Sequence, residues 1–124
     1  PVNQDAIGLV REDDYAAFSV LKIRGGRIVG HTPVHMERVT GLSNPELVEA
    51  FLVRHYEFAD NIPQEIFTEF EPLGSTTLEN YLSDSSGRKV QIRVPKRGEK
   101  HSLLNLDPPC VLVLHTTSLK FQVD

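Results

Sequence analysis

The sequence predicts an α/β fold (α+β) in which one mixed five-stranded sheet carries three helices, in the order strand, strand, strand, helix, strand, helix, strand, helix. Three observations lead to this prediction. Residues 6–34 contain three strand-like segments joined by tight turns. Two Ser/Thr-x-x-Glu sequences open segments with helical spacing of apolar residues. Each of these helical segments is followed by a short apolar segment of strand type.

The first three strands are predicted to form an antiparallel meander. Residues 6–10 are apolar and lead into the polar turn of residues 11–14. Residues 15–24 alternate, with Ala17, Ser19, Leu21 and Ile23 on one side of the strand. Gly25-Gly26 then supplies a turn, because glycine adopts positive φ angles at little cost, and residues 27–34 return as the third strand.

The first predicted helix begins after Ser43, which lies three residues before Glu46 in a capping box, and Pro45 suits its first turn. Its apolar stripe is formed by Leu47, Val48, Phe51, Leu52 and His55. Ile66-Phe67 is predicted to be a short fourth strand.

The second predicted helix begins at another capping box, Thr76 with Glu79, and ends at Gly87. In the fifth strand Val90, Ile92 and Val94 alternate with Lys89, Gln91 and Arg93. Residues 99–106 form the third helix of this prediction, which Asp107-Pro108-Pro109 must terminate.

This order of elements is that of a ribonuclease-H-like fold, in which three antiparallel strands are followed by crossovers that add parallel strands. We assign residues 1–107 to this module and residues 108–124 to a divergent apolar tail that forms an extra strand or hairpin. A chain that opens without Met and enters a strand almost at once is also expected to be a piece of a longer protein.

Composition narrows the classes of function. The net charge of −4 means that any contact with nucleic acid must be a local patch. The single cysteine, Cys110, excludes an internal disulfide and a cysteine-only zinc site, so a reducing, cytoplasmic location is expected. No apolar run is long enough for a membrane span, and no cofactor or small-molecule substrate is indicated.

The segment of residues 87–100 is the candidate nucleic-acid site. It contains six of the thirteen Lys and Arg residues and a single acid, Glu99, whereas residues 57–84 contain seven acids and no base. We predict that the cations of this segment contact the DNA phosphate backbone: Arg88, Lys89, Arg93, Lys96, Arg97 and Lys100. The alternatives are a solvated edge strand protected by its charges, and a surface that docks an acidic protein.

Catalytic and metal sites are not expected in this segment of chain. Two-metal nuclease chemistry needs converging carboxylates, and the candidates are Asp5, at or before the start of the first strand, with Glu65 and Glu69 beside the fourth. His31 and His35 share a face but lie about 13 Å apart along a strand, too far for one metal. A metal-dependent nuclease remains an alternative function.

Five strings in order resemble the central homology region of the UvrC family, the incision subunit of the bacterial excinuclease ABC in nucleotide excision repair. The resemblance spans roughly residues 5–106. Its strings are IGL at 7–9, IRGGRIVG at 23–30, LVEAFLVRHY at 47–56, NIPQEI at 61–66 and GRKVQIRVPKRGEK at 87–100.

The resemblance implies a cytoplasmic role in DNA repair and the SOS response. It implies DNA, UvrB and other UvrC domains as partners. The chain resembles the module just before the C-terminal nuclease of these proteins, whose catalytic Asp-Gly-Gly segment would lie downstream. Gly25-Gly26 follows Arg24 rather than Asp, and the sequence departs from the family pattern after Leu106. We therefore expect a scaffolding module that contacts DNA without cutting it, or one that docks UvrB or neighbouring UvrC domains.

Overall fold

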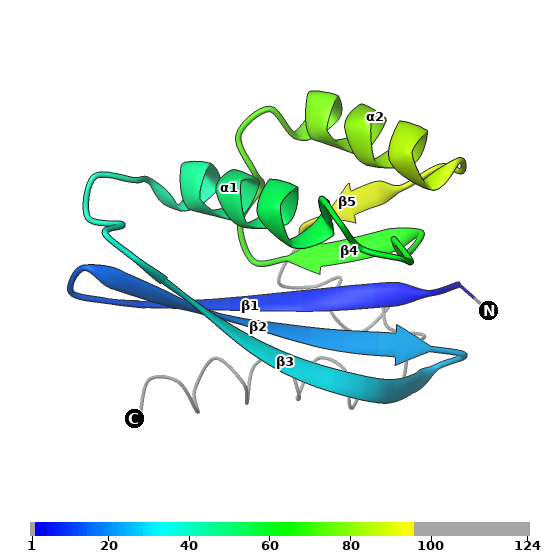
Figure 1. The fold of residues 1–124 in the computed structure, drawn as a ribbon, viewed down its shortest axis with the longest axis horizontal. Coiled ribbons are helices and arrows are strands. Elements are labelled where there is room, and N and C mark those ends of the chain that lie inside the picture. Colours follow the sequence, from blue (N-terminus) through cyan, green and yellow to red (C-terminus); the bar gives the residue numbers. More distant parts are fainter. Residues whose placement is uncertain (1, 96–124) are drawn as a thin grey trace.

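The computed structural model describes residues 2–95, which form one five-stranded sheet in the order β3-β2-β1-β4-β5 with two helices (Figure 1). The predicted mixed α/β fold is therefore confirmed. The predicted third helix and the tail of residues 108–124 lie outside the described residues. Along the chain the elements are β1 (Gln4–Glu12), β2 (Tyr15–Arg24), β3 (Arg27–Glu37), α1 (Asn44–Tyr56), β4 (Glu65–Thr68), α2 (Ser75–Ser86) and β5 (Gln91–Arg93).

The meander of β1, β2 and β3 is antiparallel throughout, as predicted. Gly25 and Gly26 form its second turn with φ angles of +58° and +77°, so both use conformations that other residues rarely adopt. β1 and β3 are longer than predicted. Asp5 consequently lies within β1, because the pairing of β1 with β2 begins at Gln4 opposite Ile23.

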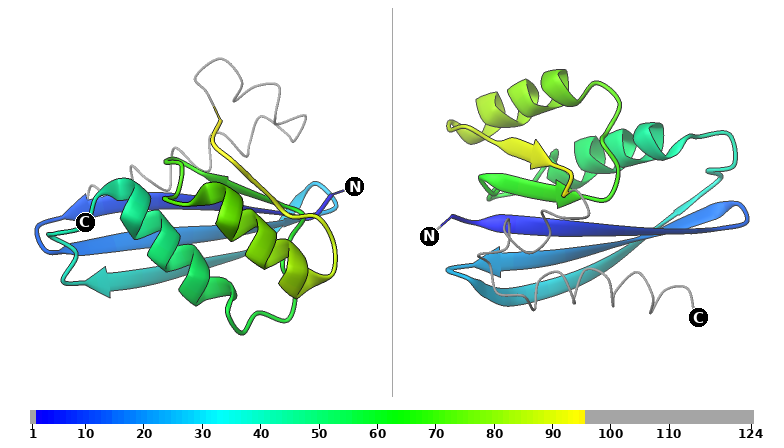
Figure 2. Two further views of the ribbon diagram at one scale, coloured as in Figure 1. Left: turned by 90° about the horizontal axis from the view of Figure 1, so that it is seen from above. Right: turned by 180° about the vertical axis from the view of Figure 1, so that it is seen from behind.

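The two crossovers place β4 parallel to β1 and β5 parallel to β4. Both helices lie on the same face of the sheet (Figures 1 and 2). The core forms between that face and the helices, where Phe18 of β2 stacks on Phe51 of α1 with ring centroids 4.0 Å apart. Neither helix of residues 2–95 is long and apolar enough to cross a membrane.

The start of α1 follows the predicted capping box. The backbone N–H of Glu46 donates to Ser43 Oγ at 3.3 Å, and the backbone N–H of Ser43 donates to Glu46 Oε1 at 3.0 Å. The hydrogen bonds that the backbone N–H and then the hydroxyl of Ser43 donate to its carboxylate lower the pKa of Glu46 below its ordinary value of 4.5. Leu47, Val48, Phe51 and Leu52 are buried, as their spacing predicted.

The capping box predicted for α2 is wrong. The N-cap of this helix is Gly74, in a left-handed conformation, and it has no side-chain hydrogen bond. Glu79 instead reaches across to β5, where its Oε2 accepts the backbone N–H of Ile92 at 2.7 Å. The carboxylate of Glu79 therefore bonds to the backbone of β5 and not to the first turn of its own helix. Gly87 ends the helix at a φ of +77°, as predicted.

Candidate nucleic-acid interface

The basic strand β5 is held in place by side chains of α2. Besides the Glu79 bond, Ser83 Oγ accepts the backbone N–H of Val90 at 2.9 Å. On its other side β5 joins the sheet, where the backbone N–H of Gln91 donates to the carbonyl of Gln64 at 2.9 Å. A segment of only three paired residues is thus fixed from both sides, which defines the direction of its side chains.

The predicted alternation along β5 is present. Val90 is 2% exposed and Ile92 packs against the core, whereas Lys89, Gln91 and Arg93 are exposed. The paired strand is shorter than predicted, since only residues 91–93 join the sheet and Val94 and Pro95 continue beyond it.

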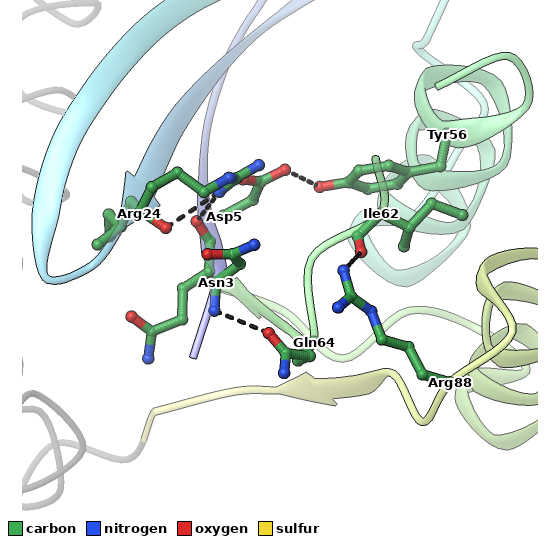
Figure 3. Close-up of polar contacts among 9 residues, drawn as sticks. Asn3, Asp5, Arg24, Tyr56, Ile62, Gln64 and Arg88 are labelled. Atoms are coloured by element: carbon green, nitrogen blue, oxygen red, sulfur yellow. Dashed lines mark hydrogen bonds and ion pairs between the residues drawn. The ribbon is translucent and has the colours of Figure 1, made fainter. Parts of the chain in front are cut away.

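Three of the six predicted phosphate-binding residues are described. Lys89 and Arg88 are exposed just before β5, and Arg88 Nη2 donates to the carbonyl of Ile62 at 3.4 Å (Figure 3). Arg93 forms an ion pair with Glu65 at 2.9 Å, yet its side chain remains 42% exposed. The other three, Lys96, Arg97 and Lys100, lie outside the described residues.

A buried polar network that sequence reasoning missed joins β1, β2 and α1 (Figure 3). Asp5 is 1% exposed, and its Oδ1 accepts from Arg24 at 3.0 Å. Its Oδ2 accepts the hydroxyl of Tyr56 at 2.6 Å. Burial, followed by the charge of Asp5 and this hydrogen bond, raises the pKa of Tyr56 well above its ordinary value of 10.0. The available signal was an acid at the start of an apolar strand and an Arg at the end of its hairpin partner.

The three carboxylates considered for metal chemistry have separate partners. Asp5 is held by Arg24 and Tyr56, whereas Glu65 accepts from Gln4 Nε2 at 2.9 Å and pairs with Arg93. Glu69 accepts the backbone N–H of Leu9 at 3.2 Å, four residues along β1 from Asp5 and so about 13 Å away along that strand. Among the described residues no group of three His, Cys, Asp or Glu side chains could hold a metal ion.

Three histidines considered as candidate site residues lie on β3 and α1. His31 Nε2 lies 2.6 Å from the hydroxyl of Ser19 on the neighbouring strand, and His35 follows four residues later on the same strand. His55 is half-buried on α1, as its helical position predicted, and its ring stacks on Phe51 at a centroid distance of 5.2 Å.

Charge is distributed unevenly between the two ends of the sheet. The end at which β1 begins, on the right in Figure 1, is here called the basic end; it has six cations against the four carboxylates of Asp5, Glu57, Asp60 and Asp84. The opposite, acidic end has eight carboxylates against two cations. The Arg93–Glu65 ion pair also lies at the basic end and adds one charge of each sign there, because Glu65 is opposite Gln4 at the start of β1. The carboxylate of Glu79 bonds to Ile92 of β5 beside this pair. The other cations of the basic end are Lys22, Arg24, Arg27, Arg54, Arg88 and Lys89.

The carboxylates of the acidic end come from both turns and helix starts. They are Glu12, Asp13, Asp14, Glu37, Glu46, Glu49, Glu69 and Glu71, and the two cations there are Arg11 and Arg38. A polyanion would therefore meet attraction at one end of the molecule and repulsion at the other.

The comparison with protein families gives the ancestry of this arrangement. The family model described as the UvrC Ribonuclease H-like domain matches residues 3–106. The chain belongs to the UvrC family. The five-stranded order and the two crossovers are accordingly those of its ribonuclease-H-like domain.

Individual relatives within the UvrC family agree with this assignment. The chain is 36% identical over 105 residues to UvrABC system protein C of Clostridioides difficile, covering 85% of this chain and 17% of the relative. It is 40% identical over 111 residues to the protein of that name from Acidothermus cellulolyticus, covering 84% and 17%. For Caldanaerobacter subterraneus the values are 33% over 103 residues, 83% and 17%. The matched part is thus about a sixth of each relative.

Proposed function

We propose that this chain is a non-catalytic module of a UvrC-type subunit of the UvrABC excinuclease, acting in nucleotide excision repair in the cytoplasm. Its role is to contact the DNA backbone and to scaffold the neighbouring domains. The single observation that carries the DNA contact is the placement of exposed cations around β5 at the basic end, away from the eight carboxylates of the acidic end.

The contact we propose is with phosphates rather than with bases. Arg88 and Lys89 are exposed on the segment that leads into β5, and Lys96, Arg97 and Lys100 follow it in the sequence. Arg93 is partly neutralised by Glu65, so it contributes less than the others unless a phosphate displaces that carboxylate. Contacts of this kind position a protein on a duplex without reading its sequence.

The proposal that the module does not cut DNA is supported by the engagement of its acids. Cleavage by two metal ions needs carboxylates around a shared site. Within residues 2–95, Asp5 is committed to Arg24 and Tyr56, and Glu69 is held at the other end of β1.

The test is the salt dependence of duplex binding, measured by fluorescence anisotropy with the whole chain. Each phosphate contact contributes about 0.9 to the slope of log affinity against log salt, so Lys89→Glu should flatten the slope by roughly one. Replacing both Lys96 and Arg97 by Glu should flatten it by about two.

Arg38→Glu is the matched control, because it makes the same change of charge on an exposed residue of the acidic end. We expect it to leave the slope unchanged. Duplex affinity that is independent of salt, or equal losses in Lys89→Glu and Arg38→Glu, would reject a localised phosphate contact.

The Arg93–Glu65 ion pair favours one alternative, a module whose basic strand docks an acidic surface of UvrB or of a neighbouring UvrC domain. This alternative predicts no duplex binding at low salt together with a measurable complex between the chain and UvrB. Lys89→Glu would then weaken that complex.

A further inference from the structure

A groove lies between the second half of β3, at the edge of the sheet, and the end of α1. It has a volume of about 490 Å³ and is lined mainly by apolar and aromatic side chains. Val34 and Met36 of β3 form one wall, and Phe51, Arg54 and His55 of α1 form the other, with Phe58 just beyond the helix. The β5 segment described above contributes nothing to this lining.

Aromatic rings converge on this groove. Phe18, Phe51 and His55 form a continuous stack, with interplanar angles of 7° and 13° between successive rings, and His55 is its outermost member. Phe58 is 87% exposed, the highest value among the exposed large hydrophobic residues of the described chain. Burial lowers the pKa of His55 below its ordinary value of 6.5, so its ring is neutral at neutral pH.

The permanent charge within the lining of the groove is positive. Arg54 is its one permanently charged lining residue among those described, and no Asp or Glu lines it. An adjoining pocket shares His55 and Ala59 with the groove and contains Lys22 and Arg24. Asp5 of that pocket is already paired with Arg24, which leaves Asp60 as its other carboxylate.

We infer that this groove binds an unpaired nucleobase, stacked against Phe58 and His55, from a DNA strand whose phosphates lie along Arg54 and Lys22. Flat aromatic surfaces beside cations are what single-stranded nucleic acids bind, since every base offers a ring face and every linkage a negative charge. The inference rests on the proposed function for its choice of DNA as ligand, but it uses residues outside the β5 segment.

The experiment compares two probes on the same variants by fluorescence anisotropy: a thymidine oligonucleotide, and a duplex of the same length. Phe58→Ala should weaken binding of the single strand by about fivefold or more, the low end of the cost of losing one base–aromatic stack. It should leave duplex binding unchanged. Phe58→Tyr should retain the affinity for the single strand, because the ring remains.

Tyr81→Ala is the matched control, since it truncates an exposed aromatic residue on α2, outside the groove. It should change neither affinity. Phe58 is so exposed that truncation removes little buried area, and an unchanged melting temperature will verify this.

The outcomes separate this inference from the proposed function. Unchanged affinity of Phe58→Ala for the single strand overturns the inference, while salt-dependent duplex binding still supports the phosphate contact. Equal losses on both probes also overturn it, because a paired base cannot stack in the groove. Single-strand binding that requires Phe58, without duplex binding, supports the groove and rejects the duplex contact.

Discussion

Removing one hydroxyl group tests the buried network of Asp5, Arg24 and Tyr56. The Tyr56→Phe substitution keeps the ring, which is 3% exposed, so it leaves no large cavity. It deletes the donor to Asp5 Oδ2, which the hydroxyl reaches at 2.6 Å, while Arg24 still binds Oδ1. A buried carboxylate oxygen then loses its hydrogen bond.

Hydrogen bonds to charged acceptors contribute about 1.5–3 kcal/mol, so we expect a loss of roughly 2 kcal/mol in the free energy of unfolding. For a chain of this size that corresponds to a fall of about 8 °C in melting temperature. Urea unfolding with an unchanged m-value is the assay. Tyr15→Phe is the control, because it removes the same hydroxyl from a residue that is 40% exposed.

The pH dependence provides a second, independent signature. The pKa of Tyr56 is raised in the folded state above its ordinary value of 10.0, so above pH 10 the folded protein retains a proton that the unfolded chain releases. The free energy of unfolding of the unsubstituted protein should therefore fall as pH rises above 10. The difference in this free energy between the unsubstituted protein and Tyr56→Phe should shrink over the same range. A Tyr56→Phe loss no larger than that of Tyr15→Phe would refute the reasoning.

Three further perturbations have defined outcomes. Glu79→Ala should lower the free energy of unfolding in urea by about 2 kcal/mol, because it leaves the backbone N–H of Ile92 without a hydrogen-bond acceptor. It should also speed hydrogen exchange of the Ile92 amide, and slow exchange there would contradict the role assigned to Glu79. Ser43→Ala should cost about 1 kcal/mol through loss of the cap, and Ser43→Asp should restore most of it. Because the pKa of His55 is lowered on folding, the unfolded chain binds its proton first, and stability should fall as pH drops below 6.5. His55→Gln should remove that part of the acid dependence, and an unaltered pH profile would show that His55 is not its source.

The fold was accessible to sequence reasoning wherever the signal is local. Alternation of apolar residues identified the strands, and Gly25-Gly26 identified their second turn, because both depend on neighbouring residues alone. The capping box of Ser43 was correct for the same reason. The matching pattern at Thr76 did not form a capping box, because Glu79 instead accepts a hydrogen bond from the backbone N–H of Ile92, thirteen residues away on β5.

In the candidate sites, too, sequence reasoning found the residues that stand together in the chain and missed the contacts between distant residues. Arg88, Lys89 and Arg93 were found as a run of cations, but the partner of Arg93 is a carboxylate on β4, twenty-eight residues away. The Asp5 network joins residues separated by nineteen and fifty-one positions, so no local pattern reveals it. The groove beside Phe58 combines β3 with the end of α1 and was not predicted.

By itself, the sequence determined the order and type of the elements within residues 2–95 and the concentration of positive charge near β5, since periodicity and composition act over a few residues. The acids of residues 57–84 formed one block in the chain, yet the sheet places Glu57, Asp60 and Asp84 at the basic end and Glu69 and Glu71 at the acidic end. Only the tertiary structure decided that division, the burial of Asp5 and the assembly of the aromatic groove. Each of them depends on contacts between distant segments, which form only when strand register and helix packing bring those segments together.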